Sequence, residues 1–374
     1  MSPASRGDKI RRTLAVGAVG AGAVLSARAL LRPQLQTPRR LVDWEDVRRI
    51  AVSRSGEVGR GVGMNAEALE AAYTEMAARV APLLVEVCQV PLTAYPRFIA
   101  LDRQGFIDAN LGMVQRLLAP VERIRATVPE SLATGMSRRV LDRYVGELFG
   151  LMARRVLGQY DPVLALEAAP GTTRQASALY LVEPNIAGIE RDLHLSGTDL
   201  RPWLILHELT HAWQFEVHPW LGEHLESVMR GLMLDALSAD GQTLLPSSQM
   251  VRRLPDTVRS QVQAIRHVQA VMSVLEGYSN FVMHRAGRDA IRGSDRLEAA
   301  MQQRRRQRGP IERLVLTITG LEMKMRQYEV GEHFAVGVVD RAGLSTLNRV
   351  WESAEMMPTL DELRHPDRWL KRAA

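Results

Sequence analysis

Two histidines and a glutamate fall within five positions of an otherwise apolar stretch, LILHELTHAWQFE, at residues 204–216. His207 and His211 are four residues apart, so on a helix they lie one above the other on the same face. Both imidazoles can then reach one metal ion, and Glu208 lies beside the first of them. In this H-E-x-x-H pattern, bound Zn²⁺ lowers the pKa of a water molecule, and the glutamate takes its proton as it attacks a carbonyl. The pattern predicts a zinc-dependent hydrolase with Glu208 as general base.

The other interpretation of this stretch is two core histidines beside an exposed glutamate. A catalytic zinc site needs three protein ligands and one open position. The metzincin pattern puts a third histidine six residues after the second, where this chain has Val217, and a glycine where it has Gln214. His218 is one residue out of phase. A third ligand of the metzincin kind is therefore not expected.

A glutamate from a later helix, as in gluzincins, fits better. The stretch VMSVLEGYSNFVMHRAG, at 271–287, reads as an apolar-rich helix that contains Glu276. A carboxylate in such surroundings needs a partner, and a metal ion is a good one. Asn280 and His284 follow on the same helical face. Asn280 stands where the thermolysin-like pattern has an aspartate that orients the first histidine. We predict Glu276 as the third zinc ligand and Asn280 as a residue that accepts a hydrogen bond from the first histidine.

Composition and charge limit the class of protein. The chain has 374 residues, 46% of them hydrophobic, which is typical of a globular protein. Its net charge is +6, but residues 1–40 carry eight basic side chains and one acidic one, so they contribute +7 and the remainder sums to −1. A near-neutral body has no general attraction to phosphate, so no nucleic-acid partner is expected. The single cysteine, Cys88, excludes an internal disulfide framework and a cysteine-cluster zinc site.

The first 40 residues are predicted to form a basic and apolar tail outside the folded domain. Fifteen uncharged residues lie between Arg12 and Arg28, which is short for a membrane-spanning helix. Their length and basic lead match a signal-peptide core, and Arg11-Arg12 resembles a twin-arginine signal. We expect a cytoplasmic protein or membrane association through residues 10–31; export and a misplaced start codon stay open.

Residues 41–374 are predicted to form a single, mainly helical domain (α+β). Helical spacing of apolar residues runs over Met64–Cys88, with Asn65 as N-cap, again from 107 until Pro120, and from Ser137 towards Gly158. Short strands are expected at 98–103 and 179–183. The H-E-x-x-H helix is expected to begin near Thr198 or Asp199. We divide the domain into a helical part, about 41–165, and a catalytic part, about 175–374.

The sequence resembles the zincin-like family also called DUF2342 or zincin_2, whose actinobacterial members include one labelled as associated with coenzyme F420 biosynthesis. That label implies no F420-binding site, and no organic cofactor is expected. Besides the HELTH helix, the resemblance is carried by stretches that span nearly all of 41–374: VDWEDVRRIA (42–51), LGQYDP (157–162), LYLVEPNI (179–186), PWLGEHL (219–225), VLEGYSNFVM (274–283), GLEMKMRQYEVGEHF (320–334) and VVDRAGLSTLNRVWESAEMMPTL (338–360).

The resemblance implies a zincin-like metallopeptidase fold, with the H-E-x-x-H helix, a second ligand-bearing helix and a few short strands. It implies a zinc-dependent hydrolase or peptidase acting on a peptide or protein substrate. The strand LYLVE would then be the edge that pairs with extended substrate. A peptidase also needs a donor for the oxyanion; the candidates are Tyr278, His284, Tyr160, Arg326 and Tyr328. The alternative is a catalytically inactive, zincin-like scaffold or binding protein with a structural zinc, against which the intact Glu208 argues.

Overall fold

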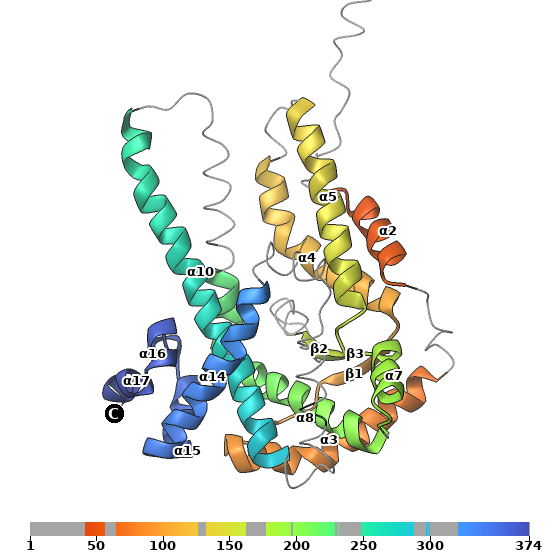
Figure 1. Ribbon diagram of the computed structural model, residues 1–374, viewed down its shortest axis with the longest axis vertical. Helices are drawn as coiled ribbons and strands as arrows, with labels where there is room; N and C mark the ends of the chain where they lie inside the picture. Colours follow the sequence, from red (N-terminus) through yellow and green to blue (C-terminus); the bar gives the residue numbers. More distant parts are fainter. Residues whose placement is uncertain are drawn as a thin grey trace, which may run out of the picture. The chain divides into compact units, whose positions relative to one another are not determined.

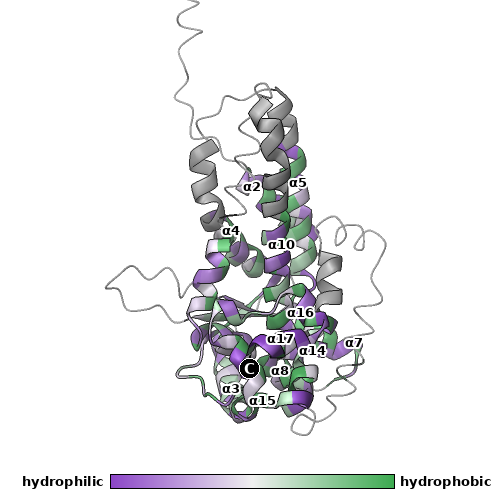
Figure 2. Cartoon of the chain, turned by 90° about the vertical axis from the view of Figure 1, so that its left-hand side faces the viewer, coloured by the Kyte–Doolittle hydropathy of each residue, from purple (hydrophilic) through white to green (hydrophobic). Residues whose placement is uncertain are grey.

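The computed structural model describes residues 42–56, 65–125, 132–161, 177–195, 197–228, 231, 248–287, 297, 299 and 321–373. Residues Val42–Val121 and Glu130–Ala374 form one compact unit, and the fold below is the fold of that unit. The tail 1–40, with the predicted membrane-associated segment at 10–31, lies outside the described residues. Figure 2 shows hydrophilic and hydrophobic residues interleaved along the long helices. None of the described helices is both long enough and apolar enough to span a membrane.

Most of the described chain is helical, as predicted. The first helices among the described residues are α2 (Trp44–Arg54), α3 (Ala66–Cys88), α4 (Arg103–Arg125) and α5 (Leu132–Ala153). Asn65 precedes α3 as predicted, although its side chain makes no capping hydrogen bond. Two helix boundaries were predicted wrongly: α4 continues past Pro120, and α5 begins five residues before Ser137. Pro120 and Ser137 indicate helix boundaries only by their residue types. Such local signals are unreliable where tertiary packing extends a helix beyond them.

A three-stranded sheet lies beside the helices (Figure 1). Its strands are β1 (Arg97–Leu101), β2 (Gly158–Asp161) and β3 (Ala178–Val182), in the order β1-β3-β2. The central strand β3 pairs in parallel with β1 and antiparallel with β2, and all five of its residues are buried. The prediction that LYLVE forms an edge strand is therefore wrong. A central strand that is buried on both faces has apolar residues at successive positions, as LYLV does. An edge strand does not need such a continuous apolar sequence.

A polar cluster fixes the start of α8 (Gly197–Glu216), the helix that carries the H-E-x-x-H pattern. Near its first turn, Arg201 contacts Glu183 at 3.1 Å and Glu190 at 2.8 Å. Both glutamates belong to α7 (Glu183–Asp192), which directly follows β3. Tyr73 of α3 donates a hydrogen bond to Glu183. Because these groups are largely shielded from water, their pairing holds α8 in register with α7 and α3.

The second long element of the site is α10 (Ser248–Val282), which continues as a π-helical turn, η2 (Met283–Gly287). It packs along α14 (Leu321–Ala342), as Figure 1 shows. The two backbones meet at glycines. A Cβ on Gly277 would lie 2.2 Å from the carbonyl carbon of Gly331, and a Cβ on Gly331 would lie 1.9 Å from the carbonyl oxygen of Ser273. Only glycine allows this approach, and it occurs one residue after Glu276.

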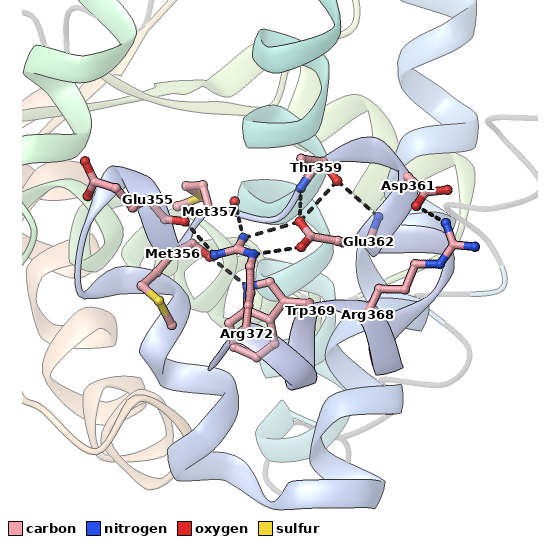
Figure 3. Close-up of polar contacts among 9 residues, drawn as sticks. All are labelled: Glu355, Met356, Met357, Thr359, Asp361, Glu362, Arg368, Trp369 and Arg372. Atoms are coloured by element: carbon pink, nitrogen blue, oxygen red, sulfur yellow. Dashed lines mark hydrogen bonds and ion pairs between the residues drawn. The ribbon is translucent and has the colours of Figure 1, made fainter. Parts of the chain in front are cut away.

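Short helices at the C-terminal end of the chain cover α14: α15 (Leu344–Asn348), η3 (Arg349–Trp351), η4 (Ala354–Met356), α16 (Leu360–Arg364) and α17 (Pro366–Ala373). In Figure 3, Arg372 reaches back to Glu362, which also forms a capping box with Thr359. Trp369 is fully buried, and its ring packs edge-on against Phe334 of α14. These contacts close the core on the side of α14 that faces the C-terminal segment.

Candidate metal centre

The structure brings His207, His211 and Glu276 together, although 65 residues separate the second from the third. One ligand atom from each lies within 4.8 Å of the others, and they form the one such group of three or more found among the described residues. The two Nε2 atoms are 3.3 Å apart. Glu276 Oε2 lies 3.8 Å from His207 Nε2 and 3.6 Å from His211 Nε2.

These separations fit a single metal ion. Two ligands held 2.0–2.1 Å from a tetrahedral zinc lie about 3.3–3.4 Å from each other. The two imidazoles match this edge, and the carboxylate oxygen lies only a few tenths of an ångström beyond it. Two neutral imidazoles whose Nε2 lone pairs face each other repel unless a proton or a metal lies between them. Two nitrogens and one carboxylate oxygen are also the donor set of many catalytic zinc sites.

Neighbouring side chains orient both histidines. The ring of Trp203, one turn earlier on α8, stacks on His207 with an interplanar angle of 6°. His211 Nδ1 lies 2.9 Å from Gln214 Oε1 and 3.4 Å from Ser279 Oγ. Burial lowers the pKa of His211, but the Glu276 carboxylate outweighs burial and raises it to about 9. In the metal-free chain His211 therefore holds a proton that a metal ion would displace.

Glu208 is buried between α8 and β2. Its side chain is 5% exposed, and the backbone N–H of Tyr160 donates a hydrogen bond to its carboxylate. Burial raises the pKa of Glu208 to about 7, and Glu276 adds to the rise, while His211 and the Tyr160 N–H oppose it. A Cβ on Gly158 would lie 2.7 Å from Glu208 Oε1, so glycine lets β2 pass this close to the carboxylate without displacing it.

The whole chain was compared with known proteins. The sequence profile of the zincin-like metallopeptidase family matches residues 42–370. The chain belongs to this family. A crystal structure from Chloroflexus aurantiacus, described as that of a proposed hydrolase with a novel fold, is 32% identical and superposes with a TM-score of 0.64. The match covers 88% of this chain and 98% of that one. The search of curated proteins found no match.

Membership in the zincin-like metallopeptidases confirms the resemblance read from the sequence and the mainly helical, zincin-like fold. It supports a metal-dependent hydrolase in general terms, with a metal that in zincins is typically zinc. Neither match mentions coenzyme F420, so that association stays a prediction.

Two of the predicted oxyanion donors have hydroxyls that are bonded to other side chains. Tyr278 is buried in the core, where its ring stacks on Trp213 and its hydroxyl donates to Asn348 Oδ1 at 2.8 Å. The hydroxyl of Tyr160 donates to Glu216 at 2.7 Å. The prediction of these two tyrosines rested on residue type, which does not show what their hydroxyls contact. The side chains of Arg326 and Tyr328 lie outside the described residues.

The roles predicted for His284 and Asn280 stay predictions. His284 lies in the π-helical turn η2 and is paired with Glu332 of α14. A π-turn redirects side chains relative to an α-helix and is frequent at functional sites. Asn280 is half-buried next to Ser279. Its predicted role in orienting His207 stays a prediction. Sequence analysis missed Ser279 as a contact of His211, and considered Gln214 only as a departure from the metzincin glycine.

His218 is a half-buried histidine packed between two tryptophans, and it is not part of the group formed by His207, His211 and Glu276. Its ring packs edge-on against Trp213 at 4.8 Å and stacks on Trp351 at 5.8 Å. Burial lowers the pKa of His218 to about 4. In the unfolded chain the pKa returns to its ordinary value near 6.5.

This shift predicts acid sensitivity. Between the two pKa values the unfolded chain binds more protons than the folded one, so stability falls as pH drops from about 6.5 towards 4. Between about pH 7 and pH 5, we expect the free energy of unfolding to fall by about 1 kcal/mol more in wild type than in His218→Phe. Solvent reaches part of the ring, so the effect is smaller than full burial would give. Urea denaturation of both metal-free proteins measures it. Equal losses would show that His218 does not titrate in this way.

A second histidine pair lies in the same body. His224 Nε2 and His267 Nε2 are 2.6 Å apart, which is shorter than the edge of a zinc tetrahedron, about 3.3 Å. The contact is a hydrogen bond with one proton between the rings. Neither histidine joins a third metal-ligating group among the described residues, and we assign this pair to packing between α10 and the segment after α8.

Proposed function

We propose that this protein is a zinc-dependent metallohydrolase of the gluzincin type that cleaves peptide bonds. His207, His211 and Glu276 would hold the zinc, and Glu208 would act as general base. The observation that carries the proposal is the convergence of the three ligand atoms at separations that suit one zinc ion. The burial of Glu208 beside them supports catalysis, because a purely structural zinc does not require that residue.

The chemistry is divided between the metal and the chain. Zinc, when bound, polarises the substrate carbonyl and lowers the pKa of the attacking water. Glu208 takes the proton from that water and returns it to the leaving amine. A group that both accepts and returns a proton works best with a pKa near the working pH. The contact with β2 and the hydrogen bond from the Tyr160 N–H hold Glu208 in place for both steps.

The edge of β2 is the proposed binding site for an extended peptide, in place of LYLVE. The carbonyl of Leu157, just before β2, accepts a hydrogen bond from Val182 of β3 at 2.8 Å. Backbone groups alternate along a strand, so those of Gly158 and Tyr160 point away from β3. The Tyr160 N–H is on the side of Glu208. Since that N–H is bonded to Glu208, a substrate strand along this edge would pair with the remaining outward backbone groups of Gly158 and Tyr160 and present its carbonyl next to the general base.

For the oxyanion, His284 is the donor that we propose. It follows Glu276 on the ligand helix, and the Glu332 carboxylate holds its Nδ1. With Nδ1 held by this carboxylate, an Nε2–H on the ring would be the group that donates to a developing negative charge. Tyr278 and Tyr160, whose hydroxyls are committed to Asn348 and Glu216, are not retained.

Zinc content tests the ligand set. We expect about one zinc per chain in the dialysed full-length protein, and a loss of affinity of at least about 100-fold in Glu276→Ala, because one of three protein ligands is removed. Elemental analysis and chelator competition measure it. Glu75→Ala removes an exposed carboxylate from α3 and serves as the matched control.

The outcomes separate cleanly. Zinc in wild type and Glu75→Ala, but not in Glu276→Ala, supports the three-ligand site. Equal zinc in all three proteins would remove Glu276 from the site. If wild type bound no zinc, the two histidines of HELTH would be interpreted as core residues and not as metal ligands.

A further inference from the structure

Gln214 links the second histidine of the pattern to the helix that carries Glu276. Its side chain is fully buried, three residues after His211 on α8. Gln214 Oε1 lies 2.9 Å from His211 Nδ1. On its other side, Gln214 Nε2 donates to the carbonyl oxygen of Leu275 at 2.9 Å. Leu275 is the residue before Glu276, so one amide contacts both ligand-bearing helices.

The direction of these bonds determines where the protons lie. A backbone carbonyl oxygen only accepts hydrogen bonds, so the group that faces Leu275 must be the NH₂ of Gln214. Its amide oxygen must then face His211. An amide oxygen also only accepts, so His211 Nδ1 must carry a hydrogen. The neutral ring consequently presents the lone pair of Nε2, the atom that faces His207 and Glu276.

The contacts of Ser279 also indicate that His211 Nδ1 carries a hydrogen. Its hydroxyl donates to the carbonyl oxygen of Leu275 at 2.9 Å. Having used its hydrogen there, Ser279 Oγ has only lone pairs to offer to His211 Nδ1, 3.4 Å away. Two buried groups on different helices therefore act as acceptors towards the same ring nitrogen.

We propose that Gln214 is a positioning residue that fixes His211 as the tautomer with hydrogen on Nδ1 and ties its ring to the Glu276 helix. This inference rests on the proposed function, since it assigns a role to a neighbour of a proposed zinc ligand. Gln214 acts through His211 and does not touch the metal. A neutral amide fixes the tautomer and orientation of the ring without the extra basicity that a carboxylate partner gives.

Zinc affinity of full-length variants tests the proposal. Gln214→Leu removes the acceptor and keeps most of the volume, and we expect zinc to bind about 10- to 100-fold more weakly. Gln214→Glu retains an acceptor for His211 but loses the donor to Leu275, and should recover most of the affinity. Thr210→Val is the matched control, because it removes a fully buried hydroxyl of α8 that bonds to Leu206 instead of to the site. It should bind zinc like wild type.

A second measurement uses wild type alone, in case Gln214→Leu does not fold. Long-range proton–nitrogen NMR of the zinc-loaded protein shows which ring nitrogen of His211 carries hydrogen. We expect hydrogen on Nδ1; hydrogen on Nε2 would overturn the proposal. Equal zinc affinity in wild type and folded Gln214→Leu would overturn it too, while leaving the proposed zinc site intact. Equal weakening in the Leu and Glu variants would overturn the tautomer role, because both lose the bond to Leu275 and only Leu loses the acceptor for His211 Nδ1. A wild type that binds no zinc would refute the proposed function itself.

Discussion

Glu208→Gln should retain zinc and lose hydrolysis. The substitution keeps the shape of the side chain and an oxygen for the Tyr160 N–H, but it removes the group that takes a proton from the attacking water. General base catalysis contributes about 10²- to 10⁴-fold, so we expect turnover to fall by that factor. Zinc content and turnover of the best substrate from a peptide library, measured on the same preparations, give both results.

The control for this substitution is Glu223→Gln, an exposed glutamate after α8, which should leave zinc and turnover unchanged. Unchanged turnover in Glu208→Gln would remove Glu208 from the mechanism. If zinc-loaded wild type cleaved no peptide in the library, the scaffold with a structural zinc would become the better interpretation.

Gly277→Ala should destabilise the protein strongly. The added methyl would lie 2.2 Å from the backbone of Gly331, so α10 and α14 must separate. Overpacking against backbone that cannot rotate aside costs about 3 kcal/mol. We also expect weaker zinc binding, because Glu276 is the preceding residue. Thermal denaturation of the metal-free proteins and zinc competition measure the two effects.

Gly188→Ala is the matched control. Gly188 lies inside α7, and a Cβ there meets nothing within 4 Å. Alanine should stabilise the helix by about 0.5–1 kcal/mol. If Gly277→Ala were as stable as this control, the helix crossing would be looser than the structure indicates, and Glu276 would not depend on it.

The sequence was sufficient to find the residues that converge. The spacing H-E-x-x-H identified His207, Glu208 and His211 as candidates. Glu276 was identified because it is a carboxylate within an otherwise apolar helix. The structure brings His207, His211 and Glu276 together and buries Glu208 next to His211. Helical periodicity places His207 and His211 on one face of α8, whereas the approach of Glu276 depends on how α10 packs against α8.

Other parts of the site depend on tertiary contacts that no local pattern contains. The order of the strands places β2 at the edge of the sheet, beside Glu208. In the sequence, only the glycine of LGQYDP, Gly158, indicated that the backbone passes close to another group there. Tyr278 has a suitable type and lies two residues after Glu276, but that offset turns it to the opposite face, against Trp213. The role of Gln214 depends on the carbonyl of Leu275, a backbone group that has no side-chain signature.

The pairing of β1 with β3 has a consequence for how the protein folds. These strands are parallel neighbours, and between them the chain contains α4, α5 and β2. Parallel pairing across such a long connection closes slowly, because the loop-closing entropy is lost before the contacts form. Until then β3 is an apolar strand with an unpaired edge, which favours self-association. Refolding yield should therefore fall as protein concentration rises, and fragments that lack 97–101 should aggregate.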